Sequence, residues 1–211
     1  MADQLTMHGT REWVRGFAER VIEHADELTA LDAAVGDADH GANMASVSRA
    51  LLDTLDDPRS DIGAVLRQVG LTIVSRVGGA SGPLYGTFFL RLGAACGDAI
   101  ALDTSAVAAA LRSAVDGVAS RGKCALGDKT MLDALTPAVE ALEAAVAAGP
   151  RLPDALAAAA QAAARGRDAT VGMVAAKGRA SRLGRDSVGH ADPGAASAAL
   201  LLDAAAAAVR S

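Results

Sequence analysis

The clearest helical pattern in the chain is the stretch DIGAVLRQVGLTIVSRVGG, residues 61–79. Its apolar residues recur at the spacing of one helix face: Ile62, Val65, Leu66, Val69 and Ile73. The pattern begins after Asp61 and stops at the helix-breaking pair Gly78-Gly79. The stretch therefore predicts one amphipathic helix between two polar links.

The same spacing recurs on both sides of this helix and predicts seven more. They are expected at about residues 10–28, 44–55, 81–95, 104–122, 131–148, 153–174 and 193–210. Thr10 is the expected N-cap of the first, and Asp192 followed by Pro193 marks the start of the last. Pro137 lies inside the predicted helix 131–148, where a kink or a late start is expected. No convincing strand alternation is visible.

The composition favours a helical protein of one domain. Of the 211 residues, 51% are hydrophobic and 2% aromatic, so the core must be aliphatic, mostly Ala, Leu and Val. Ala is the best helix former, and its small side chain lets helices approach closely. Helices joined by short links usually pack antiparallel to their neighbours. The sequence therefore predicts an all-α fold, an antiparallel up-down bundle or barrel of eight helices, with residues 1–211 as a single domain.

Charge and targeting signals exclude several functional classes. The net charge of −5 gives no basic surface for nucleic acid. The N-terminus has no signal-peptide core, and the apolar stretches are too interrupted by charge to span a bilayer. Cys96 and Cys124 fit no metal-binding spacing, so two reduced core thiols are expected. We expect a soluble cytoplasmic protein that binds neither nucleic acid nor membrane.

The links between the predicted helices differ in character. Those after the first, third, fifth and seventh helices are rich in Gly and in charged or hydroxyl residues. In an up-down bundle, alternate links lie at the same end. The prediction is that residues 32–43, 78–86, 122–130 and 177–194 meet at one end and form the functional site.

The first of these links, LDAAVGDADHGANM, carries the carboxylates of Asp32, Asp37 and Asp39. Three carboxylates this close repel one another unless a positive charge lies between them. Hard oxygen ligands suit Mg²⁺ or Ca²⁺. An EF-hand is excluded because its twelfth position, counted from Asp37, is Ser48 rather than Glu, and zinc is disfavoured because only His40 offers a nitrogen ligand nearby. A helix cap with solvated carboxylates stays open as the alternative.

The second and third links are weak signals when taken alone. The second, VGGASGPLYGT, places glycines and small hydroxyls before a helix, where backbone N–H groups can hold phosphate. The third contains GVASRGKC, which resembles a P-loop, but Cys124 replaces the hydroxyl residue and a helix precedes it instead of a strand. We therefore reject a P-loop. Asp128, Lys129 and Thr130 are expected either to cap the next helix or to contact a ligand.

The fourth link is long and rich in Arg, and long loops in compact domains are often functional. Its arginines are candidates for phosphate contacts, with solvated surface charge as the alternative for each: Arg179, Arg182 and Arg185.

Taken together and in this order, the four links resemble the nucleotide-binding subunit of dihydroxyacetone kinase, the DhaL type. The motifs that carry the resemblance are GDADHGANM, GGASGPLYGTFF, RGKCALGDKTMLDAL and GRASRLGRDSVGHADPGA. The resemblance covers nearly the whole chain. It implies an antiparallel barrel of eight helices with the nucleotide at one end, which agrees with the helix count and the grouping of the links.

The resemblance also implies roles for individual residues. Asp32, Asp37 and Asp39 would hold two magnesium ions bridged to the phosphates of ADP or ATP. Arg179 would reach the phosphates and act with the aspartates in catalysis. The other implied nucleotide contacts are His40, Gly41, Ala42, Asn43, Ala80 and Ser81 at phosphate and sugar, Gly122 and Met131 at adenine, and Asp192, Pro193 and Gly194 at the closure of the pocket. Ser181 is a weaker candidate, and Arg182 stands where the family commonly has an aromatic residue.

The activity implied by the resemblance is transfer of a γ-phosphoryl group to dihydroxyacetone, a step of glycerol metabolism. The family holds the ketose covalently on a His of a separate, DhaK-type subunit, so this chain alone would be an incomplete kinase. In one mode, bound ADP is a coenzyme recharged by a phosphoenolpyruvate-dependent phosphotransferase protein of the DhaM type. In the other, ATP is consumed by an enzyme in which both domains are usually fused. A chain of this length favours the first mode.

Three alternatives stay open at this point. The chain could be a nucleotide-loaded regulatory or assembly module that contacts a transcription regulator. It could instead be an ATP-consuming kinase subunit for another small ketose or a fatty acid. The plainest alternative is a structural helical bundle with an acidic loop.

Overall fold

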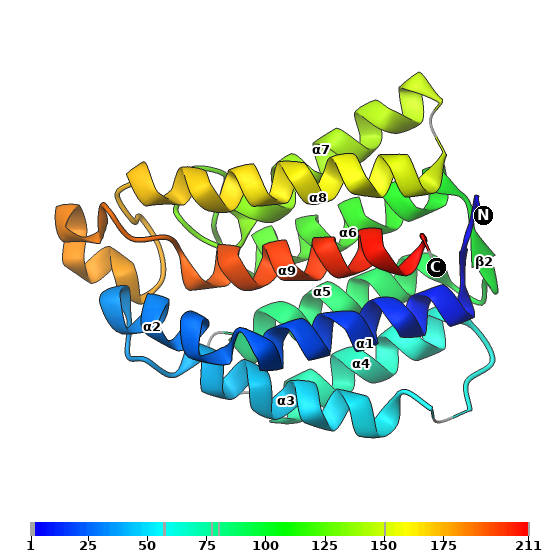
Figure 1. The fold of residues 1–211 in the computed structure, drawn as a ribbon, viewed down its shortest axis with the longest axis horizontal. Helices are drawn as coiled ribbons and strands as arrows, with labels where there is room; N and C mark the ends of the chain where they lie inside the picture. The colour runs from blue at the N-terminus through cyan, green and yellow to red at the C-terminus, as the bar shows by residue number, and fades with distance from the viewer. Residues whose placement is uncertain (1–2, 57, 77, 80, 150, 211) are drawn as a thin grey trace.

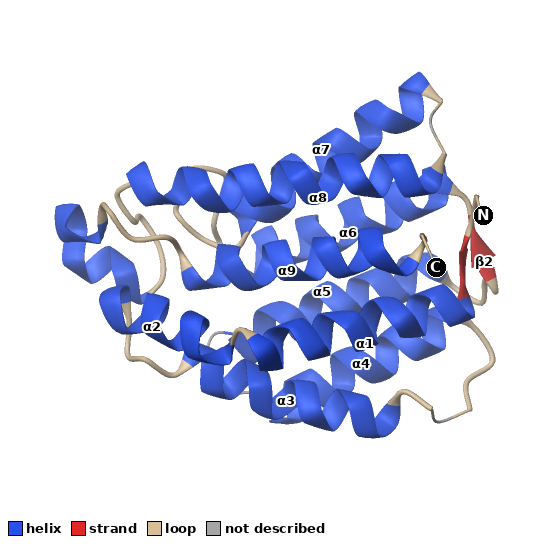
Figure 2. Cartoon of the chain, viewed as in Figure 1, coloured by secondary structure: helices blue, strands red, loops and turns tan. Residues whose placement is uncertain are grey.

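The structure is a computed structural model that describes residues 3–56, 58–76, 78–79, 81–149 and 151–210. This part of the chain forms nine α-helices and two very short strands (Figure 1, Figure 2). The helices are α1 (Met7–Glu23), α2 (Ala25–Val35), α3 (His40–Thr54), α4 (Ile62–Arg76), α5 (Ser81–Cys96), α6 (Thr104–Gly122), α7 (Leu132–Ala148), α8 (Leu152–Ala169) and α9 (Pro193–Ala208). The other elements are β1 (Leu5–Thr6), β2 (Ala101–Leu102) and the 3-10 segments η1 (Thr170–Gly172) and η2 (Arg179–Ser187).

Eight of the described helices form a closed ring. Each packs against the next in the order α1, α3, α4, α5, α6, α7, α8, α9, and α9 packs against α1. Successive helices run in opposite directions, so the links alternate between the two ends of the barrel (Figure 1). Both chain termini lie at one end, and α2 lies at the other (Figure 1). The predicted antiparallel barrel of eight helices is confirmed, with α2 as a ninth helix in the described part of the chain.

The predicted first helix is in fact two helices. α1 ends at Glu23, and His24, with φ −96° and ψ 15°, separates it from α2. The N-cap is also not Thr10: the hydroxyl of Thr6 accepts the Gly9 N–H at 3.1 Å, while Thr10 is buried and donates its own hydroxyl to the Thr6 carbonyl. The break at His24 separates α2, which carries Asp32, from the wall of the barrel.

Two smaller expectations are also resolved in part. α7 begins at Leu132, so Pro137 lies in its second turn, and the late start that was one of its two expected effects is excluded. β1 and β2 pair antiparallel, with Leu5 opposite Leu102, at the end of the barrel that holds the termini (Figure 2). Strands of two residues are too short to show alternation in a sequence.

The interior of the barrel is one apolar cluster with few aromatic rings and many alanines. Trp13 is 2% exposed, and its indole N–H donates to the Leu201 carbonyl at 2.8 Å, which joins α1 to α9. Phe17 and Tyr85 stack with ring centroids 5.9 Å apart, which joins α1 to α5 through the interior. Small alanines along α9 fill the rest, as the composition predicted.

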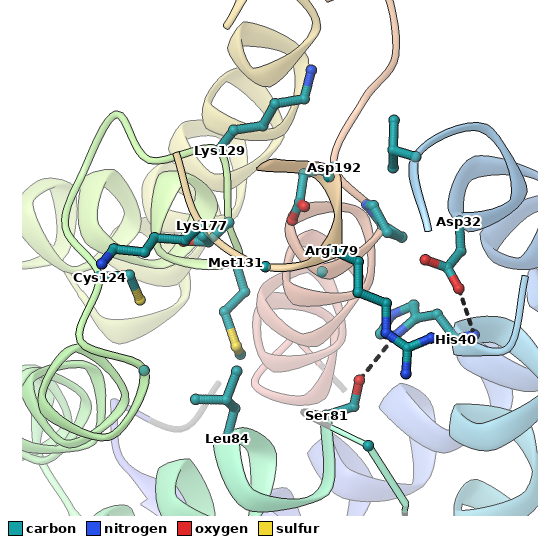
Figure 3. A pocket seen from close by; sticks show the side chains of 18 of the residues that line it. Asp32, His40, Ser81, Leu84, Cys124, Lys129, Met131, Lys177, Arg179 and Asp192 are labelled. Carbon is teal, nitrogen blue, oxygen red and sulfur yellow. Dashed lines mark hydrogen bonds between the residues drawn. The ribbon is translucent and has the colours of Figure 1, made fainter. Parts of the chain in front are cut away.

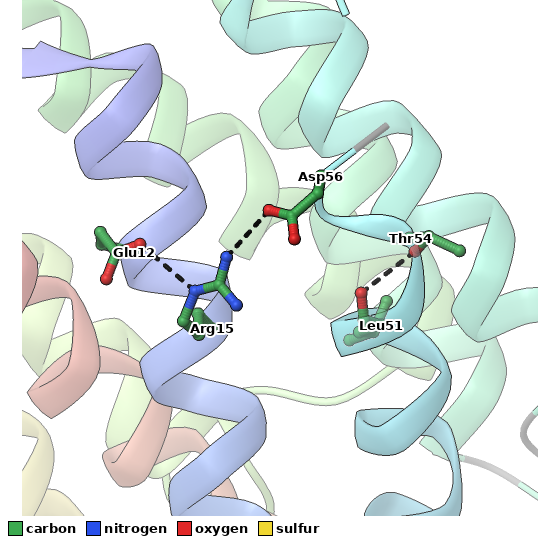
Figure 4. Close-up of polar contacts among 5 residues, drawn as sticks. All are labelled: Glu12, Arg15, Leu51, Thr54 and Asp56. Atoms are coloured by element: carbon green, nitrogen blue, oxygen red, sulfur yellow. Dashed lines mark hydrogen bonds and ion pairs between the residues drawn. The ribbon is translucent and has the colours of Figure 1, made fainter. Parts of the chain in front are cut away.

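The outer faces of the helices carry charged side chains. Arg15 of α1 bonds to Glu12 at 3.3 Å and to Asp56, just beyond α3, at 3.1 Å (Figure 4). The Asp56 side chain is 82% exposed, so this contact orients the end of α3 but contributes little to stability. No helix among the described residues is long and apolar enough to cross a membrane.

α4 and α5 pack closely because glycines face one another along their seam. A Cβ added at Gly93 would lie 2.8 Å from the Gly63 carbonyl oxygen and 2.9 Å from the Arg67 nitrogen. Both atoms belong to the backbone of α4 and cannot move aside as a side chain would. The seam therefore sets the spacing of two barrel walls whose neighbouring ends carry the second link.

We predict that Gly93→Ala lowers the free energy of unfolding by about 1–3 kcal/mol, because the added methyl forces α4 and α5 apart. Urea denaturation followed by circular dichroism measures the change. The matched control is Gly172→Ala, where an added Cβ meets nothing within 4 Å, and it should stay within about 0.5 kcal/mol of the parent. Equal stabilities of the two variants would contradict the role of the seam.

Candidate functional site

A cavity of about 380 Å³ opens at the α2 end of the barrel. It is lined by residues of all four links that the alternation of helices brings to this end, and Figure 3 shows their side chains. The prediction that these links meet at one end is therefore confirmed. The volume is in the range of small-molecule sites, which are usually concave and mostly apolar with a few placed polar groups.

The first link brings three carboxylates together. One oxygen atom each of Asp32, Asp37 and Asp39 lies within 4.8 Å of the others. Asp32, in the last turn of α2, accepts the backbone N–H groups of Asp39 at 2.9 Å and His40 at 3.1 Å. Ala38 has φ 63°, a left-handed conformation that costs a non-glycine residue roughly 1 kcal/mol. The strained turn is thus held in place by the carboxylate that it faces.

Positive charge reaches the carboxylates from the fourth link. Arg179, the first residue of η2, forms an ion pair with Asp37. Figure 3 shows the Arg179 side chain extended from the fourth link into the cavity toward His40 and Ser81. Because one guanidinium cannot neutralise three carboxylates, this hard oxygen cluster fits an additional divalent cation such as Mg²⁺.

His40, the first residue of α3, is the centre of a buried hydrogen-bond network. Its Nδ1 lies 3.1 Å from the Ser81 hydroxyl and its Nε2 lies 2.9 Å from the Ser197 hydroxyl. The Tyr85 hydroxyl lies 2.7 Å from that of Ser197. Burial lowers the pKa of His40, against the opposing effects of the Asp32 carboxylate and the Pro193 carbonyl, so the ring favours its neutral form.

The network determines which way its protons point. The Ser197 hydroxyl donates to the Gly194 carbonyl at 3.1 Å, and it has one proton to give. Its oxygen therefore accepts from both Tyr85 O–H and His40 Nε2–H. In neutral His40 the other nitrogen, Nδ1, then accepts from Ser81. Ser81 is left with lone pairs toward the cavity, which suits a hydroxyl, a metal-bound water or a cation.

The third link and the first turn of α5 supply the apolar side of the cavity. Figure 3 shows the Met131 sulfur facing Leu84, with Cys124 on the same side. The loop before α7 is organised by Asp133, which is 1% exposed and accepts the N–H groups of Gly127 at 2.6 Å and Thr130 at 2.7 Å. Burial raises the pKa of the Cys124 thiol, so this sulfur is an apolar wall rather than a reactive thiolate.

Asp192 links the cavity to the start of α9. Its carboxylate accepts the Ala195 N–H at 2.7 Å, which confirms the predicted N-cap. Burial raises the pKa of Asp192 to about 7, with the Ala195 N–H acting in the opposite direction. A cation bound nearby would favour the ionised form and so strengthen the cap.

Most of the residues expected at the site line the cavity: Asp32, Asp37, Asp39, His40, Ser81, Gly122, Met131, Arg179, Asp192, Pro193 and Gly194. Gly41, Ala42 and Asn43, in the first turn of α3, are not among the lining residues. Gly41 faces α2 instead, because an added Cβ would collide with the Ala25 carbonyl and the Thr29 side chain. Ala80 lies outside the described residues.

Two weaker candidates lie away from the cavity. The Ser181 hydroxyl donates to the Gly178 carbonyl at 2.7 Å and serves the local turn of η2. Arg182, at the position where the resemblance leads one to expect an aromatic residue, is exposed and does not line the cavity.

Several residues of the cavity and of the His40 network were missed or left open in the sequence. Arg121, Leu84 and Lys177 line it, and each looks like an ordinary helix or loop residue in the sequence. Ser197 sits in an Ala-rich helix, where a small hydroxyl gives no signal. Tyr85 was left open between stacking and packing, and the structure shows it fully buried at 1% exposure with its hydroxyl in the network.

Comparison with known proteins identifies relatives of the whole chain. The sequence pattern of the DAK2 domain matches residues 34–207. The DhaL ADP-binding subunit of the PEP-dependent dihydroxyacetone kinase of Escherichia coli (strain K12) is 41% identical over 191 residues, which are 90% of this chain and 91% of the relative. The corresponding subunit of kinase 1 of Listeria innocua is also 41% identical, over 91% of both chains. D-erythrulose kinase of Mycolicibacterium smegmatis is 38% identical over 95% of this chain but 36% of its own length.

Solved structures show the same fold. The dihydroxyacetone kinase of C. freundii, in its native form, superposes with a TM-score of 0.73 at 27% identity over 94% of this chain. A second structure of that kinase, in complex with AMP-PNP and Mg²⁺, gives a TM-score of 0.72 at the same identity. This chain spans about a third of those longer chains, 34% and 33% of their lengths.

The hydrogen-bond network predicts that His40 is neutral at pH 7 with its proton on Nε2, because Ser197 has no second proton to offer. Long-range proton–nitrogen NMR distinguishes the two tautomers directly. The signals of His40 are assigned by their loss in His40→Gln, which separates them from those of His8, His24 and His190. A proton on Nδ1, or a doubly protonated ring at pH 7, would contradict the network.

Proposed function

The chain belongs to the DAK2 domain family, and on that basis we propose that it is the nucleotide-binding subunit of a dihydroxyacetone kinase. The observation that carries this proposal is the cavity, in which a carboxylate cluster and an arginine stand opposite an apolar wall. Such a site suits both the charged phosphates and the flat base of a nucleotide. We propose residues 1–211 as one DhaL-type domain, because the ring of helices is closed by contact between α1 and α9.

The proposed cofactors are ADP, or ATP in its charged form, and two Mg²⁺ ions. Asp32, Asp37 and Asp39 would hold the magnesium, since three hard oxygens within 4.8 Å fit this ion. When bound, magnesium supplies neutralisation of phosphate charge. The AMP-PNP and Mg²⁺ bound to the C. freundii kinase support this choice of ligands.

The chain's own residues would bind and orient the nucleotide. Met131 and Gly122 would border the adenine, beside Leu84 and Cys124. Because Ser81 donates its proton to His40, its oxygen would accept a hydrogen bond from a hydroxyl or a metal-bound water. Arg179 would move its guanidinium charge from Asp37 to the phosphates, where positioning and charge are the main sources of rate in phosphoryl transfer.

Transfer to the ketose would need a partner. We propose that dihydroxyacetone is held on a DhaK-type subunit, and that bound ADP is recharged by a phosphoenolpyruvate-dependent relay protein of the DhaM type. The 41% identity to the ADP-binding subunits of two PEP-dependent kinases supports this mode. The erythrulose kinases are nevertheless the observation that favours a second candidate, an ATP-consuming kinase for another small ketose.

We predict that Asp37→Ala abolishes retention of magnesium and ADP, because the two remaining carboxylates no longer enclose the cation. Isothermal titration calorimetry with Mg-ADP should show a loss of affinity greater than the roughly 10–100-fold typical of an outer-shell partner. Asp53→Ala, which removes an exposed carboxylate of α3, is the matched control and should bind as the parent does. Unchanged binding by Asp37→Ala would remove the proposed metal site.

A reconstituted assay is expected to separate the coenzyme mode from its alternatives. The chain is mixed with a DhaK-type subunit and dihydroxyacetone, and sugar phosphate is followed while either the phosphoenolpyruvate relay or ATP is supplied. We predict sustained turnover with the relay and catalytic ADP, because ADP would stay bound and be recharged in place.

Stoichiometric loss of ATP without the relay would instead make the chain an ATP-consuming kinase subunit, and erythrulose is then the next acceptor to test. Nucleotide binding without transfer under either condition would favour the regulatory or assembly module.

A further inference from the structure

Lys129, in the loop between α6 and α7, is a buried lysine that the proposed chemistry does not use. Its side chain is 1% exposed, and its backbone has φ 60°, in the left-handed region. Lys129 is one of the residues that line the cavity, and Figure 3 shows its side chain extending toward the fourth link, away from Met131 and Ser81. Burying an ammonium group costs several kcal/mol unless hydrogen bonds replace those that it made with water.

The partners are two backbone carbonyls at the two ends of one loop. The Lys129 ammonium donates to the Met173 carbonyl at 3.1 Å and to the Ser187 carbonyl at 2.5 Å. Met173 follows η1, and Ser187 is the last residue of η2, so the ammonium spans the base of the segment 173–187. That segment carries Lys177 and Arg179, both of which line the cavity.

Other contacts make the same base rigid. The Ser187 hydroxyl accepts the Ala175 N–H at 2.9 Å and donates to the Gly184 carbonyl at 2.6 Å. The Ala176 N–H donates to the Asp128 carbonyl at 3.1 Å, which joins the fourth link to the residue before Lys129. A loop of this length has much conformational freedom to lose, and these bonds fix its two ends side by side.

From its base the loop reaches the carboxylate cluster. Ala180 is buried with Val35 and Ala175 in a small apolar cluster, which packs η2 on the end of α2. Arg179 lies next to Ala180 and pairs with Asp37. The position of the guanidinium therefore depends on two anchors, the Val35 contact at the tip of the loop and the Lys129 ammonium at its base.

We infer that Lys129 is a positioning residue, whose buried ammonium binds both ends of the segment 173–187 and thereby sets where Arg179 stands over the carboxylates. The inference rests on the proposed function for its kinetic consequence, since Arg179 is the group that would meet the phosphates. Its structural part, the immobilised loop, stands on the hydrogen bonds alone.

The test variant is Lys129→Met, which removes the donors while keeping an unbranched stem of similar length. Hydrogen exchange should become faster in residues 174–189 and stay unchanged in α4 and α5. In the reconstituted assay kcat should fall by about 100-fold, the order expected when a group is misplaced by about an ångström. Lys123→Met is the matched control, because Lys123 is exposed, also has positive φ and does not line the cavity.

A double-mutant cycle with Arg179→Ala tests whether Lys129→Met lowers kcat through the position of Arg179. If Lys129 acts by placing Arg179, Lys129→Met should change kcat by less than about threefold when Arg179 is already absent. An equal fold-loss in both backgrounds would overturn the inference, as would unchanged exchange in the loop. Ser187→Ala, which removes two bonds of the same base, gives the same test by a milder change if Lys129→Met does not fold.

The outcome also separates this inference from the proposed function. A parent protein that neither binds Mg-ADP nor supports transfer would overturn the proposed function. The hydrogen-exchange measurement would then test the structural role of Lys129 by itself. Faster exchange confined to residues 174–189 supports that role, and unchanged exchange overturns it.

Discussion

The end of the barrel that holds the cavity must compensate the mutual repulsion among the carboxylates of Asp32, Asp37 and Asp39. Oxygen atoms of the three lie within 4.8 Å of one another, where like charges oppose folding strongly unless they are compensated. Two backbone N–H groups on Asp32 and the guanidinium of Arg179 provide part of that compensation. The remainder is what a divalent cation would supply.

The barrel makes this arrangement possible through the alternating direction of its helices rather than through local sequence. Because the eight helices of the described ring alternate in direction, every second link falls at the same end. Four segments that are far apart in the chain then share one cavity, where the carboxylates of the first link and the Arg179 guanidinium of the fourth lie near Ser81 and Met131. The glycine seam between α4 and α5 and the small alanines of α9 keep the walls close enough for the links to touch.

Much of this was predictable from the sequence, because the apolar spacing of the helices and the alternation of the links between two ends both follow from the order of the residues. The helix from residue 62, the Asp192 cap and the meeting of the four links all follow from them. The break at His24 was not predictable, since the apolar spacing from Trp13 to Leu28 continues across it.

The site itself was predictable in its charged residues but not in its supports. From the sequence, Lys129 was expected to cap the next helix or contact a ligand, and its clamping of the fourth link was missed because its two acceptors are carbonyls some fifty residues away in the chain. Ser197 reads as a filler among alanines for the same reason. Gly41 was expected to contact phosphate, but its small size serves the close packing of α3 on α2. Polar contacts between single residues far apart in the chain produce no periodic pattern in the sequence.

The most direct test of the account is a crystal structure of the protein grown with ADP and Mn²⁺, in which manganese replaces magnesium and can be located by its anomalous scattering. We predict anomalous density bonded to Asp32, Asp37 and Asp39, with the ADP phosphates on its other side and the base against Met131. Manganese found elsewhere, or ADP bound outside the four-link cavity, would contradict the account.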